Sequence, residues 1–340
     1  MFSCKKKDNN SPTKFGTILP SSTGGADEVM IILPDNIMDS TMQYFMGHTI
    51  NESYKILPSP EAVFKISQVQ YSIMNNLMYR YRNIILVADI SQKSEILGLA
   101  KQTLSTEDFK ALEEGKQYFF HVSNIWSEPQ QVFYIFGTSM QNIKDNESKN
   151  AKKIRNTIIK SDIGVYKKIA YINGSNQKLK EQWLEFQGVS LDIPTDYKLA
   201  DNEDNFVLLR KEIKKGMIFL SVDFINYSDK VPDANYGIKL RDERGKYVSS
   251  NSYNSYTKTD STLGFLETKK IKGDLTIYET NGLWRMENDF MGGPFINQYI
   301  IDHKNNRVIY LDGFIYAPGE NNKKKYLRQI EAIFNTLKVK

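Results

Sequence analysis

The sequence predicts an α+β fold with mixed, largely antiparallel sheets and packed helices, arranged as two α+β units of similar size. Short apolar runs bounded by turn residues recur along the chain, which is the pattern of buried strands. Stretches with apolar residues at helical spacing lie between these runs, and a hairpin pattern precedes the last helical stretch. With 40% hydrophobic residues in 340, the chain can form a substantial core.

Residues 1–26 are expected to form a lipid-anchor cysteine and a flexible tether. Cys4 is the only cysteine of the chain, and a small residue, Ser3, precedes it. This placement is typical of the acylated cysteine of a bacterial lipoprotein. Lys5–Lys7 and the polar residues that follow are too poor in apolar surface to fold, so they predict a tether with weak attraction for anionic lipids.

A lipoprotein signal also needs a charged start and an apolar run of roughly seven to fifteen residues before the cysteine. Three residues precede Cys4 here, so we expect the upstream part of the signal to be missing from this sequence. On this interpretation the protein is anchored in the cell envelope, at the outer membrane of a Gram-negative bacterium. The alternative is a cytosolic protein with an incidental N-terminal cysteine.

The first α+β unit is expected over residues 27–172. Ser105 predicts a helix cap, and Gly115 predicts the end of that helix. Residues 140–171 are rich in lysine with isoleucines at helical spacing, which predicts one helix or two as a basic connector. A methionine-rich stripe before it predicts a core-facing helix with Met38, Met42, Phe45 and Met46. Strands are predicted at 28–33, 64–71, 83–88, 118–126 and 131–136.

The second α+β unit is expected over residues 173–340. Ser175 is a plausible cap for a helix that places Trp183 on its apolar face and ends at Gly188. Residues 249–262 lack apolar periodicity and are expected to form a long exposed loop. The last helix carries an apolar stripe of Tyr326, Ile330, Ile333, Phe334 and Leu337. Strands are predicted at 189–193, 206–210, 217–224, and at 295–301 and 307–316, which flank an Asn305–Asn306 turn.

Four C-terminal motifs carry a family resemblance. Together they resemble a Bacteroidetes lipoprotein family classed as a domain of unknown function, DUF4837. Weaker likeness extends to Arg82–Ile84, Ile193–Pro194 and Tyr197–Lys198. The resemblance implies an envelope lipoprotein and brings no activity or catalytic residue with it. The motifs are Gly282–Trp284, Asp289–Phe295, Gly313–Gly319 and Leu327–Ile333.

One candidate contact region lies around Trp284, Asp289, Gly292 and Gly293. Paired glycines before a proline favour a sharp bend between strands, or else a loop whose exposed amides receive a ligand. The alternating Arg285, Glu287 and Asp289 predict either a charged strand surface or, less simply, a carboxylate pair for acid and base work. Trp284, Met286 and Phe290 are then expected to share the opposite face.

A second candidate region is the run Lys323, Lys324 and Lys325 at the start of the last helix. The free amides and the positive dipole end of a helix already favour anions there. An anionic partner such as a lipid head group, phosphate or acidic polysaccharide is one interpretation. Solvation of a surface helix is the other.

Other function classes lack a signal. The chain has no phosphate-binding loop, dinucleotide fingerprint or serine nucleophile elbow, and His48, His121 and His303 stand in no metal-ligand spacing. We therefore predict no cofactor, no metal and no catalytic residue. The net charge of +5 is too small to indicate nucleic acid. The sequence favours a lipid-anchored envelope protein with a binding or assembly role, with an envelope hydrolase acting on glycan or lipid near 282–295 as the alternative; oligomeric state stays open.

Overall fold

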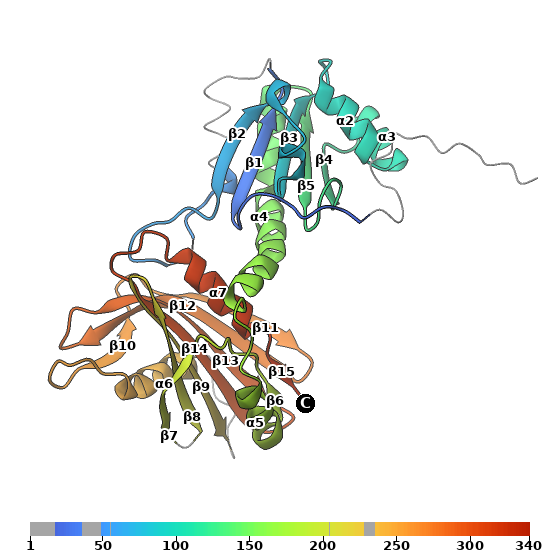
Figure 1. Cartoon of the computed structure of the whole chain (residues 1–340). Helices are drawn as coiled ribbons and strands as arrows, with labels where there is room; N and C mark the ends of the chain where they lie inside the picture. The colour runs from blue at the N-terminus through green and yellow to red at the C-terminus, as the bar shows by residue number, and fades with distance from the viewer. Residues whose placement is uncertain (1–17, 36–48, 55, 204, 228–234) are drawn as a thin grey trace, which may run out of the picture. The chain divides into compact units, whose positions relative to one another are not determined.

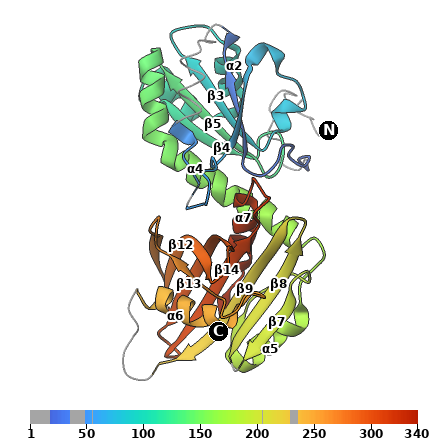
Figure 2. The ribbon, with the colours of Figure 1, turned by 90° about the vertical axis from the view of Figure 1, so that its left-hand side faces the viewer.

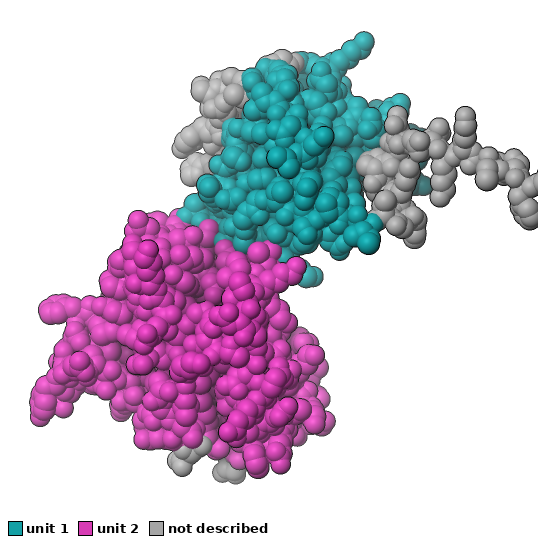
Figure 3. Space-filling model, viewed as in Figure 1, with its two compact units in different colours: residues 1–52, 62–162 teal, residues 53–61, 163–340 magenta. Residues whose placement is uncertain are grey.

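The computed structural model describes residues 18–35, 49–54, 56–203, 205–227 and 235–340 (Figure 1). The chain forms two compact units (Figure 3). Residues 1–52 and 62–162 make the N-terminal unit, and residues 53–61 and 163–340 make the C-terminal unit. Both units combine helices with a sheet, which is mixed in the N-terminal unit and antiparallel in the C-terminal unit, and this confirms the predicted α+β class.

The N-terminal unit is built on a five-stranded sheet of order β2-β1-β3-β5-β4. The first four strands in this order are parallel, and β4 pairs antiparallel with β5. Near-continuous apolar runs in β1, β3 and β5 suit strands that are covered on both faces. The strands are β1 (Glu28–Leu33), β2 (Lys65–Gln70), β3 (Asn83–Asp89), β4 (Phe119–Ser123) and β5 (Gln131–Gly137).

Helices cover the two faces of this sheet differently. The predicted connector is one continuous helix, α4 (Met140–Ala170), whose residues 140–162 belong to this unit and lie along one face of the sheet (Figure 2). The other face packs against α2 (Glu95–Thr103) and α3 (Thr106–Glu113). Ser105 caps α3 by accepting from the Asp108 amide at 3.0 Å, and Gly115 has φ +70°, which confirms both predicted helix ends. Two short 3-10 turns, η2 (Tyr71–Ile73) and η3 (Met78–Arg80), connect β2 to β3.

The C-terminal unit is built on an eight-stranded antiparallel sheet of order β10-β12-β13-β14-β9-β8-β7, with β11 paired to β12. The predicted hairpin is confirmed, and Asn306 takes the positive φ of +49° that its turn requires. The strands are β7 (Lys198–Glu203), β8 (Phe206–Ile213), β9 (Gly216–Asn226), β10 (Tyr256–Asp260), β11 (Leu266–Lys272), β12 (Leu275–Glu287), β13 (Gly292–Asp302) and β14 (Arg307–Tyr316).

Helices pack on both faces of this second sheet. On one face α7 (Lys324–Phe334) packs so closely that a methyl group on Gly313 would lie 2.3 Å from Ile330. On the other face α6 (Tyr236–Arg244), followed by η4 (Gly245–Tyr247), packs through Leu240 against Tyr299 and Tyr310. Asn176, rather than Ser175, caps α5 (Gln177–Gln187). The short β6 (Val189–Ser190) pairs with β15 (Lys338–Val339).

The expectation of an exposed loop over 249–262 is wrong for its second half. Residues 256–260 form β10, which pairs with β12, and Thr257 is buried. Its hydroxyl donates to the Gly245 carbonyl at 3.1 Å, and the Thr259 amide donates to Asp242 at 2.7 Å. Hydrogen bonds keep this strand in place, and its sequence has no alternating apolar pattern. Apolar periodicity therefore could not predict it.

Candidate functional site

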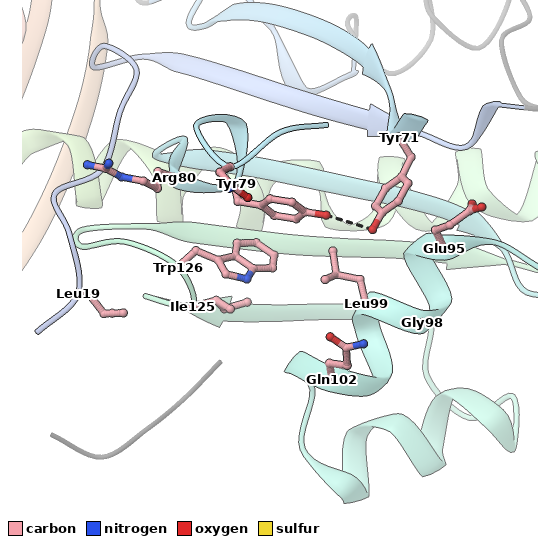
Figure 4. Close-up of a pocket in the computed structure, with 11 residues that line it drawn as sticks. Leu19, Tyr71, Tyr79, Arg80, Glu95, Gly98, Leu99, Gln102, Ile125 and Trp126 are labelled. Carbon is pink, nitrogen blue, oxygen red and sulfur yellow. Dashed lines mark hydrogen bonds between the residues drawn. The ribbon is translucent and has the colours of Figure 1, made fainter. Parts of the chain in front are cut away.

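A pocket of about 630 Å³ opens in the N-terminal unit, on the sheet face that α2 and α3 cover (Figure 4). Its floor is the edge of the core, since partly buried Tyr71, Leu99 and Trp126 pack against buried residues of the sheet. The walls come from η2, η3, α2 and the loop between β4 and β5. The lining residues are Leu19, Tyr71, Asn76, Tyr79, Arg80, Glu95, Gly98, Leu99, Gln102, Ile125 and Trp126.

Two aromatic rings form the central wall of the pocket. The rings of Tyr79 and Trp126 lie 5.1 Å apart, tilted by 58°. The Tyr79 hydroxyl lies 3.1 Å from the Tyr71 hydroxyl, the contact drawn as a dashed line in Figure 4. Rings of this kind offer large apolar faces with a polar tip, which suits a pocket that is half open to water.

The buried side chain of Gln130 hydrogen-bonds the backbone of the two segments that carry these rings. Its carbonyl oxygen accepts from the Trp126 amide at 3.0 Å. Its amide nitrogen donates at 2.7 Å to each of two carbonyls, those of Tyr79 and Tyr81. One buried amide group therefore joins the backbone of the η3 turn to the backbone of the loop after β4, the two segments that carry the rings.

The helix α2 presents one narrow face to the pocket. Glu95, Gly98, Leu99 and Gln102 follow the spacing i, i+3, i+4, i+7, which places them in one stripe. The neighbouring Ile96 and Ala100 are buried in the core. One stripe of α2 thus packs in the core, and the adjacent stripe lines the pocket.

The pocket carries opposite charges at its ends and two phenol groups between them. Figure 4 shows Arg80 at one end and Glu95 at the other. Arg80 donates to the Ser21 carbonyl at 2.8 Å. Burial, together with the hydrogen bond to Tyr79, raises the pKa of Tyr71 well above its usual value. Tyr71 therefore stays protonated at neutral pH, able both to donate and to accept.

The described lining residues supply few groups of the kind used in hydrolysis. Glycoside hydrolysis usually needs two carboxyl groups across the scissile bond, and among the lining residues only Glu95 carries one. Among the described residues that line the pocket there is no histidine, cysteine or serine. No metal-binding group of three or more acidic, histidine or cysteine residues occurs within the described ranges. Tyr, Trp and amide groups at fixed positions can stack and hydrogen-bond a ligand.

Trp284, Gly292 and Gly293 serve the packing of three strands. Trp284 is 2% exposed and donates to the Ile315 carbonyl at 3.1 Å. A methyl group on Gly293 would lie 2.0 Å from the Ile315 oxygen, and one on Gly292 would lie 2.8 Å from the Trp284 oxygen. Close backbone approach between β12, β13 and β14 is therefore enough to require both glycines.

Asp289 lies in the turn between β12 and β13, where it accepts from the Phe290 amide at 2.7 Å and from Ser252 at 3.1 Å. Phe290 is fully exposed, so the expectation that it shares a face with Trp284 and Met286 is wrong. The strand ends at Glu287, before the alternation reaches Phe290. Hydrogen bonds lower the pKa values of both Glu287 and Asp289, so neither is a protonated acid at neutral pH.

The lysine run already has an anion within the C-terminal unit. The Glu61 carboxylate accepts from the backbone amides of Lys323 at 2.8 Å and Lys324 at 3.1 Å, at the N-terminus of α7. The Lys325 ammonium lies 3.0 Å from the Glu320 carboxylate. The side chains of Lys323 and Lys324 are mostly buried. Binding of an external anion at these lysines stays a prediction.

The sequence did not single out the pocket residues. Cys4 and the stripe of Met38, Met42, Phe45 and Met46 lie outside the described residues. A signal for the pocket exists in the aromatic stretch from Tyr71 to Tyr81, where hydrophobic and polar residues mix without a period. Its partners lie on α2 and after β4, so only the fold brings them together.

No helix in the described part of the chain is long and apolar enough to cross a membrane. No characterised protein in the curated comparison matches the chain. Among solved structures, the Ran-binding protein Mog1p of Saccharomyces cerevisiae has 9% identity and a TM-score of 0.30, with 45% of this chain and 92% of that one covered. A point mutant of protein Mog1 has 10% identity and a TM-score of 0.30, with 44% and 90% covered. At such scores the likeness supports no argument.

Two family models match separate parts of the chain. Residues 22–171 match a domain of unknown function, DUF8532, and this range contains most of the pocket lining. Arg82–Ile84, where a weaker likeness to DUF4837 was expected, lies in that range and outside the DUF4837 match. Residues 175–336 match the domain of unknown function DUF4837, as the C-terminal motifs predicted.

Proposed function

We propose that this chain is a lipid-anchored protein of the cell envelope whose N-terminal unit binds a small organic ligand without transforming it. The pocket between α2, η3 and the loop after β4 is the observation that carries the binding role. Pockets of several hundred Å³ with aromatic walls and a few fixed polar groups are the usual form of a small-molecule site.

Preorganisation supports binding further. Gln130 holds the backbones of Tyr79 and Trp126 in place, and the hydroxyl of Tyr79 is fixed against that of Tyr71. A ligand therefore does not have to order these rings, which removes part of the entropic cost of association. The alternative of an envelope hydrolase on glycan or lipid near 282–295 would need a carboxyl group with a raised pKa in that region, whereas the pKa values of Glu287 and Asp289 there are lowered.

The envelope location rests on the N-terminal sequence. Cys4 followed by a polar tether is the pattern of an acylated cysteine, and the resemblance to DUF4837 implies a Bacteroidetes outer-membrane lipoprotein. Stable anchoring needs two acyl chains or one chain with a second signal. Intact-mass analysis of the protein from its native host tests this part: an acylated Cys4 as the first residue is expected, and an unmodified Cys4 preceded by Met1 would contradict it.

Ligand-observed NMR with a general fragment library tests the binding role on the full chain. Fragments are expected to bind, and Tyr79→Ala should abolish the binding of most of them because the central wall is lost. Tyr253→Ala is the matched control, since Tyr253 is 88% exposed in the C-terminal unit. Equal fragment binding by the wild type and Tyr79→Ala would refute the pocket as a site.

A further inference from the structure

We propose that the ligand of this pocket is a neutral carbohydrate, stacked on Tyr79 and Trp126 with its ring edge against the exposed backbone of α2 at Gly98. The inference rests on the proposed binding function and specifies its ligand. Three independent features of the pocket support it: the kind of hydrogen-bonding groups, the balance of charge and the presence of a glycine inside α2.

The polar lining groups are mostly of the kind that both donates and accepts. Tyr71 offers a neutral phenol, and Asn76 and Gln102 offer amides. A sugar hydroxyl also donates and accepts, so it can form a hydrogen bond with such a group whichever of the two is the donor. The apolar faces of Tyr79 and Trp126 match the apolar C–H face of a sugar ring.

The charge balance favours a ligand without net charge. The lining contains one cation, Arg80, and one anion, Glu95, at opposite ends (Figure 4). Arg80 is already engaged with the Ser21 carbonyl at 2.8 Å. An anionic ligand would be repelled by Glu95, and a cationic ligand would be repelled by Arg80. Neither therefore gains net electrostatic attraction from the pocket as a whole.

Gly98 is the least explained residue of the pocket on structural grounds. A glycine inside a helix destabilises it relative to alanine. A methyl group on Gly98 would meet no atom within 4 Å, so packing within the protein does not require the glycine. Because Gly98 has no side chain, a sugar ring can approach the helix backbone at this position. A ligand that fills this space would explain why the helix carries its weakest-propensity interior residue at the pocket wall.

Gly164 provides a matched control. It also lies inside a helix, α4, and a methyl group there would likewise meet no atom within 4 Å, but it does not line the pocket. Gly98→Ala and Gly164→Ala are therefore both expected to raise the melting temperature. Only Gly98→Ala is expected to weaken ligand binding, by about tenfold or more, which is the loss of one good contact.

The experiment screens the full chain on an array of neutral, acidic and basic glycans, beside the fragment library and a fatty-acid probe. Neutral glycans should bind, and Tyr79→Ala and Gly98→Ala should lose them while Gly164→Ala keeps them. If fragments or fatty acid bind in a Tyr79-dependent way and no neutral glycan does, the carbohydrate inference is overturned and the binding role stands. If Gly98→Ala binds neutral glycans like the wild type, the role of Gly98 is overturned. If nothing binds, both proposals fail.

Discussion

Both units contain buried ion pairs, but the candidate pocket draws on polar side chains of the N-terminal unit alone. In the C-terminal unit, buried Arg241 pairs with buried Asp312 at 3.2 Å, and buried Asp223 pairs with half-buried Arg244 at 2.6 Å. The N-terminal unit buries Arg82 beside Asp162 at 3.8 Å, and in addition polar groups of α2 and η2 line its pocket. The pocket lies on the sheet face that packs against α2 and α3. The comparison teaches that Arg241, Asp312 and Asp223 already have charged partners within the protein, whereas the polar groups of the pocket lie where a ligand could reach them.

The largest expected effect comes from breaking a buried pair of the C-terminal unit. Arg241→Met leaves Asp312 buried and unpaired, and it removes a guanidinium that lies 4.0 Å from the centre of the Phe295 ring. Loss of one partner of a buried ion pair costs about 3–5 kcal/mol. Chemical denaturation should show this loss, while fragment binding at the N-terminal pocket stays unchanged. A loss under about 1 kcal/mol would mean that the pair is not buried as described.

Gln130→Leu should be next in size. The substitution leaves the Trp126 amide and the carbonyls of Tyr79 and Tyr81 without their partner. Unsatisfied buried groups cost about 1–3 kcal/mol each, so a loss of about 3 kcal/mol is expected after partial relaxation. Binding should fall as well, because the rings lose their fixed spacing. Gln141→Leu on α4 is the control: it removes only an exposed hydrogen bond to Asp145, so it should leave binding unchanged and cost at most about 0.5 kcal/mol.

A third prediction concerns Glu147, a buried carboxyl group of the N-terminal unit, and the pH dependence of stability. Burial raises the pKa of Glu147 from its ordinary 4.5 to about 8, although a hydrogen bond with Thr49 opposes the shift. The folded state keeps this proton where the unfolded chain releases it. The contribution of Glu147 to stability is therefore complete below pH 4.5 and is lost as pH rises towards 8.

Glu147→Gln should accordingly flatten the dependence of unfolding free energy on pH in that window, by up to about 1.4 kcal/mol per pH unit. Denaturation series at several pH values measure the slope. Because Glu147 is fully buried, the glutamine variant should also be more stable than the wild type at pH 8. Parallel pH profiles for the two proteins would contradict a buried, protonated Glu147.

The sequence predicted the fold better than the site. Periodicity located β1, β3, β5 and the hairpin of β13 and β14, because their apolar residues are buried in regular patterns. It missed β10, whose Thr257 and Thr259 donate hydrogen bonds to Gly245 and Asp242. The pocket residues come from four separate segments, and only those of α2 share a helical spacing. Gln130 gives no local sign of its role, since its three partners are defined by the folded backbone.

The candidate residues chosen from sequence show the same limit. The glycine pair Gly292–Gly293 marked a real structural constraint, and the close contact with Ile315 shows what it is. The lysine run marked a real anion-favouring helix end, and Glu61 lies there. Sequence reasoning found positions under strong physical constraint, but the partner that imposes each constraint became visible only in three dimensions.

The most direct test of a ligand site in the N-terminal unit is backbone amide NMR of the full chain during titration with the tightest-binding compound from the glycan array or fragment library. The account predicts that the largest shift changes fall on Tyr79, Gly98 and Trp126, and that they vanish in Tyr79→Ala. Shift changes confined to the C-terminal unit, or changes at the pocket that persist in Tyr79→Ala, would contradict it.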